Sequence, residues 1–158
     1  MAVGAYSGPE SGVGTGATAL APGVWVTSGR TAVVEGEDGL AAIDPGDEPC
    51  GTPAKPRGPL ADLAALVRRT GKPLRWVLVT HAHPDHVANL AAFRALGPAK
   101  VVAHARSPVG PDVAVREETR LAAGGGLEAI PTPGHSRAGD DLTFWSPRSG
   151  QSGARVVA

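Results

Sequence analysis

Four side chains that can bind a metal ion lie within six residues near the middle of the chain. They are His81, His83, Asp85 and His86, and they directly follow the apolar run at residues 76–79. Three of the five histidines in this 158-residue chain are gathered here, which argues against a chance grouping. Imidazole and carboxylate groups are the usual ligands of zinc and of related transition metals. The segment therefore predicts a metal site with hydrolytic chemistry.

The spacing of these residues indicates how they would divide between two ions. In an extended His-x-His segment both rings point to the same side, so His81 and His83 can approach one ion. Pro84 disfavours helical geometry at His83 and so favours that extended form. Asp85 and His86 begin the next helix and can point differently, which places them near a second ion. A bound divalent ion lowers the pKa of its water to about 7, and we expect Asp85 to be the catalytic residue that holds or orients that water.

Two other interpretations of the polar residues are weaker. A solvated loop without metal does not explain why the cluster follows a buried strand and precedes a helix. A triad of Ser136, His135 and either Asp140 or Asp141 would need adjacent residues to meet nucleophile–base geometry, and the chain has no G-x-S-x-G motif. His104 ends a strand outside every motif, so we expect it to be a structural or pocket-rim histidine.

The elements that must position these residues follow from hydrophobic periodicity and turn residues. Apolar side chains recur at helical spacing between Pro59 and Gly71, whereas residues 74–80 are nearly all apolar, as in a strand covered on both faces. Strands come first and then alternate with helices, which predicts an α/β fold with a mixed sheet and outer helices. A long excursion that ends in a run of glycines is expected over 107–125. The expected order is strands over 24–27, 31–35 and 40–43 (an antiparallel meander), a helix over 59–70, a strand over 74–80, a helix over 87–96, strands over 100–104, 127–130 and 142–145, and a turn over 146–153 that leads to a returning strand over 154–157.

Composition limits the classes of protein to which the chain can belong. Residues 1–20 show no period and should form a flexible segment or an irregular first strand, followed by one domain over 21–158. Fifteen basic residues balance fifteen acidic ones, so we expect neither a nucleic-acid nor a membrane partner, but a small-molecule substrate. The single Cys50 excludes an intrachain disulfide, and no apolar run approaches the roughly 20 residues that span a bilayer. With no signal-peptide pattern at the N-terminus, a cytoplasmic location is expected.

Together these motifs resemble those of the metallo-β-lactamase-fold hydrolases. The family signature T-H-x-H-x-D-H after a buried strand is matched by residues 80–86, P-G-H-[ST] by residues 133–136 and I-D-x-G by residues 43–46. The opening at residues 21–26 is similar to the first hairpin of the family. The resemblance implies a metallo-β-lactamase-like αββα sandwich, of which this chain would hold the N-terminal portion.

The resemblance also implies a ligand set. His81, His83 and His135 would bind the first metal ion, and Asp85 and His86 would contribute to a second. The cofactor implied is zinc, as one or two ions, with iron or manganese as alternatives. A further residue, the acidic strand end Asp44, would orient a ligand histidine from outside the coordination shell.

The family pattern is not completed within this sequence. In the family, the strand after the hairpin that follows Trp145 ends in an aspartate that bridges both ions, and a later histidine completes the second site. The sequence stops at Ala158, so we expect a C-terminally truncated domain with a partial second site, or one that a second chain completes. Asp140 and Asp141 come too soon after His135 to be expected to supply the bridge.

Two functions remain open at this point. The first is an enzyme, a metal-dependent hydrolase that uses metal-bound hydroxide on an ester, thioester, lactone or amide. The alternative is an inactive or metal-binding fragment of such a domain that needs a missing C-terminal half. The sequence does not choose a substrate, since the fold serves many.

Overall fold

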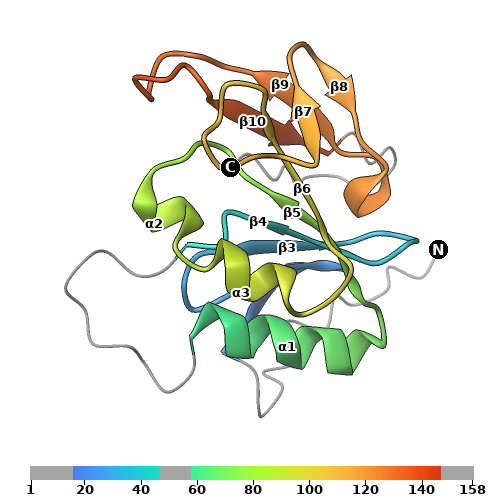
Figure 1. Ribbon diagram of the computed structural model, residues 1–158. Helices are drawn as coiled ribbons and strands as arrows, with labels where there is room; N and C mark the ends of the chain where they lie inside the picture. Colours follow the sequence, from blue (N-terminus) through green and yellow to red (C-terminus); the bar gives the residue numbers. More distant parts are fainter. Residues whose placement is uncertain (1–15, 47–57, 147–158) are drawn as a thin grey trace.

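Two β-sheets face each other in this protein, and helices cover the outer face of the larger sheet (Figure 1). The computed structural model describes residues 16–46 and 58–146. The larger sheet contains, in spatial order, β1 (Thr18–Ala21), β2 (Val24–Val26), β3 (Ala32–Glu35), β4 (Leu40–Ile43), β5 (Leu74–Leu78), β6 (Lys100–His104) and β7 (Val113–Val115). The smaller sheet contains β10 (Leu142–Trp145), β9 (Glu128–Pro131) and β8 (Thr119–Arg120). The helices are α1 (Pro59–Thr70), α2 (Pro84–Val87), α3 (Leu90–Arg94) and the short 3₁₀ helix η1 (Ala123–Gly125).

The larger sheet is mixed, as the order of elements predicts. β2, β3 and β4 form the expected antiparallel meander, and β4, β5, β6 and β7 then pair in parallel. β1 pairs with β2 through an irregularity between Ala19 and Ala21, so an irregular first strand is present within the described part of residues 1–20. The expected domain boundary at residue 20 falls inside this strand. Residues 1–15 and the returning strand expected over 154–157 lie outside the described residues.

Helix α1 spans the residues that its sequence predicts. Pro59 occupies its first turn, and Gly71 ends it with a φ of 68°, a left-handed conformation that glycine adopts without steric cost. Leu63 and Leu66 are fully buried against the sheet. On the same buried side, the Asp62 carboxylate accepts hydrogen bonds from the Gly16 amide and from the amide and hydroxyl of Ser28, at 2.7–2.9 Å. These hydrogen bonds join α1 to the segment before β1 and to the turn between β2 and β3.

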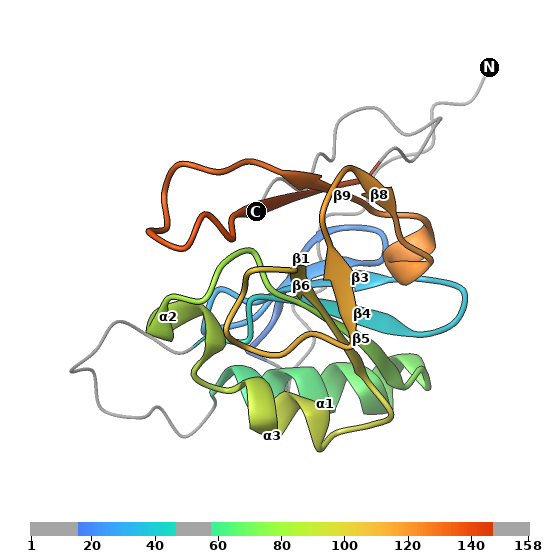
Figure 2. The same cartoon turned by 45° about the horizontal axis from the view of Figure 1, so that its top comes forward.

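Each face of the larger sheet carries its own apolar core. The core toward the helices contains Trp25, Leu40, Leu63, Leu66, Leu74, Val77 and Phe93 among others. The core between the two sheets contains Val34, Ile43, Leu78, Val102, Leu127, Leu142 and Phe144 among others. Turning the molecule shows the small sheet over one face of the large sheet and α1 and α3 under the other (Figure 2). The described residues thus form three layers, helix, sheet and sheet, of the αββα arrangement.

The helix expected over residues 87–96 is instead two short helices. The first turn begins earlier, at Pro84, and the chain breaks at Asn89, whose φ of −101° and ψ of 11° are not helical. The Asn89 amide bonds to the Pro45 carbonyl at 2.8 Å, and its side chain bonds to the Gly46 carbonyl at 2.9 Å. These contacts with the loop after β4 replace helical hydrogen bonds, which explains the break.

The excursion expected over residues 107–125 contains three short elements that the sequence does not predict, β7, β8 and η1. The two strands are only three and two residues long, which is too short for a periodic pattern to be seen in the sequence. None of the helices in the described parts of the chain has the length and apolar composition to cross a bilayer.

Candidate metal centre

The metal-ligand candidates lie at the edge of the large sheet where its parallel strands end. Asp44 follows β4, and Thr80 and His81 come directly after β5. β4 and β5 pair in parallel, so both strand ends reach the same edge. The carboxyl ends of parallel strands are the usual location of ligand sites in α/β sheets.

Three histidine rings meet at this edge. His81, His83 and His135 each offer a ring nitrogen, and these nitrogens all lie within 4.8 Å of one another. The ring centroids are 4.5 Å apart for His81 and His83, 4.7 Å for His81 and His135, and 4.9 Å for His83 and His135. His81 is buried, His83 is half-buried and His135 is exposed. The structure therefore brings together the three residues expected at the first ion, on a site with one side open to solvent.

The local backbone explains how two of these rings come to share a site. His83 precedes α2 with φ −66° and ψ 145°, the extended form that Pro84 favours. His135 arrives from the other sheet, on the loop between β9 and β10. The group is thus built from one segment of each sheet.

A hydrogen-bond chain sets the protonation of His81. The Asp44 carboxylate accepts one hydrogen bond from the Thr80 amide, at 2.8 Å, and another from the Thr80 hydroxyl, at 2.7 Å. A hydroxyl has one hydrogen, so after donating it to Asp44 the Thr80 oxygen accepts from Nδ1 of His81, which lies 3.0 Å away. This network assigns the hydrogen of His81 to Nδ1, so the lone pair is on Nε2, which faces Nδ1 of His83. A metal-binding imidazole requires this state.

The donor set fits a zinc ion. Two ligands at 2.0–2.1 Å from a tetrahedral zinc are about 3.3 Å apart. Nε2 of His81 and Nδ1 of His83 lie 2.9 Å apart, so a small adjustment would give each a place on one ion. Three imidazoles with an open fourth position are one of the known forms of a catalytic zinc site.

Burial keeps His81 in its neutral form. Burial lowers the pKa of His81 below its ordinary value of 6.5, and the neighbouring His86 and His83 lower it further, while Asp44 acts in the opposite direction. Protons compete with metal ions for imidazole nitrogens. A lowered pKa therefore favours metal binding at neutral pH.

The opposite shift holds for His86, whose ring centroid lies 4.1 Å from that of His81 and whose Nδ1 faces the Asp44 carboxylate. Its Nδ1 lies 2.8 Å from the Asp44 carboxylate, and this hydrogen bond raises the pKa of His86 above 6.5, against the effect of burial. Asp44 itself has a φ of 54°, a conformation uncommon outside glycine and often found at functional sites. Asp44 thus contacts both Thr80 and His86, which agrees with the orienting role expected of it.

The second ion remains a prediction. The Asp85 side chain is 60% exposed, and its Oδ2 lies 3.6 Å from Nε2 of His86. Within residues 16–46 and 58–146, the three histidines already described are the one group of three or more side chains close enough to share a metal ion. Neither Asp85 nor His86 belongs to that group. The structure therefore places these two residues beside each other without a third described ligand.

Sequence reasoning missed the residues that hold the ligand loops in place. Thr80 was noted only as part of the motif, and its hydroxyl proves to control His81. Asp140 and Asp141, which the sequence does not favour as metal bridges, accept hydrogen bonds from Ser136 and from loop amides. A serine after the last histidine was the one available signal for this contact.

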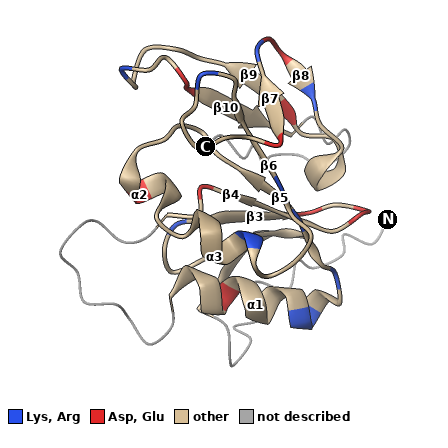
Figure 3. Ribbon diagram, viewed as in Figure 1, with Lys and Arg blue, Asp and Glu red and all other residues tan. Residues whose placement is uncertain are grey.

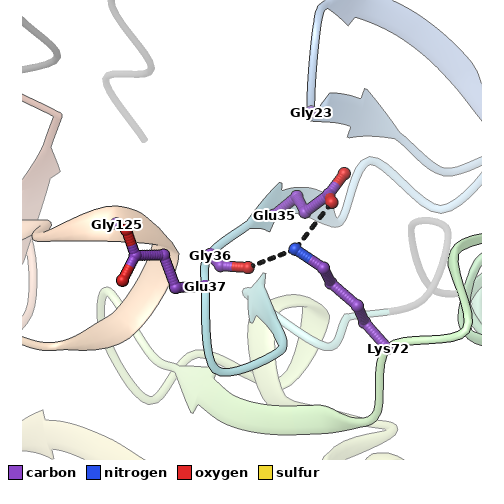
Figure 4. Close-up of a pocket in the computed structure, with 6 residues that line it drawn as sticks. All are labelled: Gly23, Glu35, Gly36, Glu37, Lys72 and Gly125. Carbon is purple, nitrogen blue, oxygen red and sulfur yellow. Dashed lines mark hydrogen bonds and ion pairs between the residues drawn. The ribbon is translucent and has the colours of Figure 1, made fainter.

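A separate hollow of about 320 Å³ lies at the other end of β5, around the turn between β3 and β4 (Figure 4). It is lined by Gly23, Glu35, Gly36, Glu37, Lys72 and Gly125. The Lys72 ammonium already contacts Glu35 at 2.8 Å and the Gly36 carbonyl at 2.7 Å. We assign this lysine a structural role, because its ammonium group already has partners within the fold. The three-histidine group lies at the opposite end of the strand.

Charged residues are interspersed over the described part of the chain. Basic residues occur on α1, on α3 and on several loops, and acidic residues lie between them (Figure 3). Both signs of charge therefore occur across the described part of the molecule.

Residues 24–111 match the sequence profile of the Metallo-beta-lactamase superfamily. The chain belongs to this superfamily. The matched stretch includes residues 80–86 and ends before His135, so the third histidine of this metallo-β-lactamase-superfamily protein is assigned from the geometry.

Two curated relatives carry the same name. The chain is 33% identical over 107 residues to a hydroxyacylglutathione hydrolase of Albidiferax ferrireducens, and the match covers 66% of the chain and 37% of the relative. It is 39% identical over 113 residues to one of Anaeromyxobacter dehalogenans, with coverage of 68% and 38%. The chain thus spans well under half the length of these relatives.

Solved structures agree on the fold. A Cronobacter sakazakii metallo-β-lactamase matches with a TM-score of 0.63 at 22% identity, over 83% of the chain and 57% of that protein. A metallo-β-lactamase of Novosphingobium pentaromativorans matches with a TM-score of 0.60 at 20% identity, over 78% and 52%. The ETHE1 protein of Myxococcus xanthus matches with 0.54 at 22%, over 77% and 48%. These likenesses support the expected metallo-β-lactamase-like architecture.

Proposed function

We propose that this chain binds zinc through His81, His83 and His135 and supplies the first metal site of a thioester hydrolase. The observation that carries this proposal is the set of three imidazole nitrogens within 4.8 Å of one another. The hydrogen-bond chain from Asp44 through Thr80 supports it further, because it presents the correct nitrogen of His81. Iron or manganese are alternatives, but three imidazoles with an open position suit zinc well.

Each residue of the site has a part in the proposed reaction. When bound, the ion would supply Lewis acidity that makes water a nucleophile at neutral pH. Asp85, with its exposed carboxylate, would hold that water by a hydrogen bond and accept its proton. The open side at His135 would admit a small-molecule substrate.

The relatives favour a thioester among the substrates of the fold. Both curated relatives are named hydroxyacylglutathione hydrolase, and glutathione is joined to its acyl group through sulfur. An ester, lactone or amide is the competing class. Because the chain spans 37% and 38% of those relatives, the activity of a whole protein is itself part of the proposal.

A second candidate is a metal-binding fragment without catalytic activity. It is favoured by the absence, within the described residues, of a third ligand beside Asp85 and His86. Such a chain would bind one ion and would need residues from a longer or second chain to act as an enzyme.

The first test is the metal content of the purified full chain, measured by elemental analysis with a His81→Ala variant. We expect about one zinc per chain and its loss in the variant, because removal of a buried ligand leaves two of three imidazoles. A His104→Gln variant is the matched control, since His104 lies outside the group, and it should keep its zinc.

A hydrolysis assay with a hydroxyacyl thioester of glutathione then separates the two candidates. Turnover that depends on His81 and Asp85 supports the enzyme. Zinc bound without turnover favours the fragment, and a folded chain that takes up no zinc contradicts both.

A further inference from the structure

Asp140 is one of three buried acidic residues in the part of the chain that the structure describes, with Asp62 and Asp141. It is 1% exposed and lies in the loop between β9 and β10 that also carries His135. No Lys, Arg or His forms an ion pair with it among the residues that the structure describes. A buried carboxylate is costly unless hydrogen bonds or a cation compensate it, so its retention here needs a reason.

The contacts of Asp140 join the two segments that carry the histidines. Its Oδ2 accepts the backbone amide of Ala82, between His81 and His83, at 3.2 Å. Its Oδ1 accepts the hydroxyl of Ser136, the residue after His135, at 2.5 Å, and its own amide donates to that hydroxyl oxygen at 3.1 Å. One carboxylate thus connects the segment from the large sheet with the loop from the small sheet.

The neighbouring Asp141 has a different task. Its carboxylate accepts hydrogen bonds from the Gly134 amide at 3.2 Å and from the Ser136 amide at 3.0 Å. Its Oδ2 also lies 3.1 Å from the Ser136 hydroxyl, whose one hydrogen goes to the nearer Asp140. All of these contacts stay within the turn around His135. Asp141 therefore shapes the turn, whereas Asp140 fixes the position of that turn relative to His81 and His83.

Hydrogen bonds keep Asp140 charged although it is buried. Burial alone would raise the pKa of Asp140, but hydrogen bonds from Ser136 and from backbone amides outweigh it and hold the pKa below its ordinary value. The group is therefore ionised at neutral pH.

We propose that Asp140 is a positioning residue for the three-histidine site, which sets the distance between His135 and the His81–His83 pair by bonding to both Ala82 and Ser136. This inference rests on the proposed metal site. It gives the serine of the P-G-H-[ST] motif a role, since the Ser136 hydroxyl is the partner through which Asp140 reaches the loop. It also explains why Asp140 and Asp141 are absent from the ligand group: their oxygens are occupied by loop donors.

Titration of the metal-free full chain with Co²⁺ tests the proposal, because cobalt absorption reports both affinity and ligand geometry. Four variants are compared with the wild type. Asp140→Ala and Ser136→Ala each remove one end of the link, Ser136→Thr keeps the hydroxyl, and Asp62→Asn is the control. Asp62 is a matched buried carboxylate, 2% exposed and bonded to loop donors, but it lies on α1 away from the histidines.

We expect Asp140→Ala to bind Co²⁺ about 10–100-fold more weakly and with a changed visible spectrum, the range typical when support behind a ligand is lost. Ser136→Ala should shift in the same direction, and Ser136→Thr should recover most of the wild-type affinity. Asp62→Asn should lower the resistance to urea but leave the Co²⁺ affinity and spectrum unchanged. A merely structural role for Asp140 would give the Asp62 pattern instead.

Each other outcome has a clear meaning. Wild-type affinity and spectrum in a folded Asp140→Ala variant would overturn the inference and leave the proposed metal site standing. If that variant does not fold, as judged by circular dichroism, Ser136→Ala decides, and unchanged binding there overturns the inference. A wild-type chain that binds neither Co²⁺ nor Zn²⁺ overturns the proposed function, and the inference with it.

Discussion

A single hydroxyl hydrogen at Thr80 connects a carboxylate to a candidate metal ligand. Since the hydrogen goes to Asp44, the Thr80 oxygen can serve His81 only as an acceptor. The same carboxylate accepts a hydrogen bond from Nδ1 of His86. One acidic residue therefore determines which nitrogen each of two histidines presents, and it does so from outside the proposed coordination shell.

The two histidines that Asp44 controls should titrate on opposite sides of 6.5 in the metal-free protein. The pKa of His86 is raised by its bond to Asp44, and the pKa of His81 is lowered by burial. We expect NMR titration of the ring protons to show His86 protonated at a pH where His81 is neutral. Asp44→Asn should lower the pKa of His86.

The sign of the accompanying stability change follows from linkage. Because the pKa of His86 is raised on folding, its pair with Asp44 stabilises the fold fully below 6.5, and this contribution is lost as the pH rises through the raised value. The lowered pKa of His81 changes stability with pH in the opposite direction, so the loss is measured as the difference between the urea-unfolding profiles of the metal-free wild-type chain and of Asp44→Asn. A His86 pKa at or below that of His81 would contradict the assignment.

The residue types of the site were predictable from the sequence, but their supports were not. For histidines at i and i+2 before a proline, the local backbone conformation alone places both rings on the same side. His81 and His83 could therefore be assigned to one site from the sequence. The link from Asp140 to Ala82 joins positions 58 residues apart, and no local pattern encodes it. Three-dimensional proximity alone reveals such contacts.

At the scale of elements, Gly46 allows the loop after β4 to lie directly against α2. A Cβ at this position would lie 1.7 Å from the carbonyl oxygen of Asp85, a backbone atom that cannot move alone. Gly46→Ala should therefore displace the first turn of α2 and lower the free energy of unfolding by roughly 1–3 kcal/mol. Urea unfolding measures the stability, and the His86 ring resonances report the displacement.

Gly58→Ala is the matched control for this change. A Cβ at Gly58 meets nothing within 4 Å, and its φ of −81° is open to any residue. We expect its stability to stay within about 0.5 kcal/mol of the wild type. Equal effects of the two substitutions would show that the close approach at Gly46 is unimportant.

The elements that sequence reasoning located well are those with local signals at both ends. Helix α1 has a proline in its first turn and a glycine after its last, and the structure confirms both limits. The break at Asn89 was missed because it depends on carbonyls of residues 45 and 46, far back along the chain. β7 and β8 owe their extended form to neighbouring strands rather than to their own pattern.

At the scale of the whole molecule, the apolar core between the two sheets holds the small sheet, and with it the loop of His135, against the large sheet. Phe144 on β10 is fully buried in this inter-sheet core. Phe144→Ala should lower the free energy of unfolding by about 3–5 kcal/mol, as large cavities do in closely packed cores. Chemical denaturation of the full chain provides the measurement.

Leu20→Ala gives the comparison, because Leu20 is 58% exposed on the edge strand β1. Its replacement should change stability by less than about 0.5 kcal/mol. If Phe144→Ala were equally mild, the small sheet would not be packed on the large one as described.

The division of the three histidines between the two sheets has a consequence in time. During synthesis the segment with His81 and His83 leaves the ribosome well before the loop with His135, and long-range pairing of this kind is the slow part of folding. The β9–β10 hairpin must dock on the large sheet before the three rings meet. We therefore expect a folding stage in which His81 and His83 are close together but His135 has not yet joined them. The complete three-histidine site should be among the last features of the fold to form.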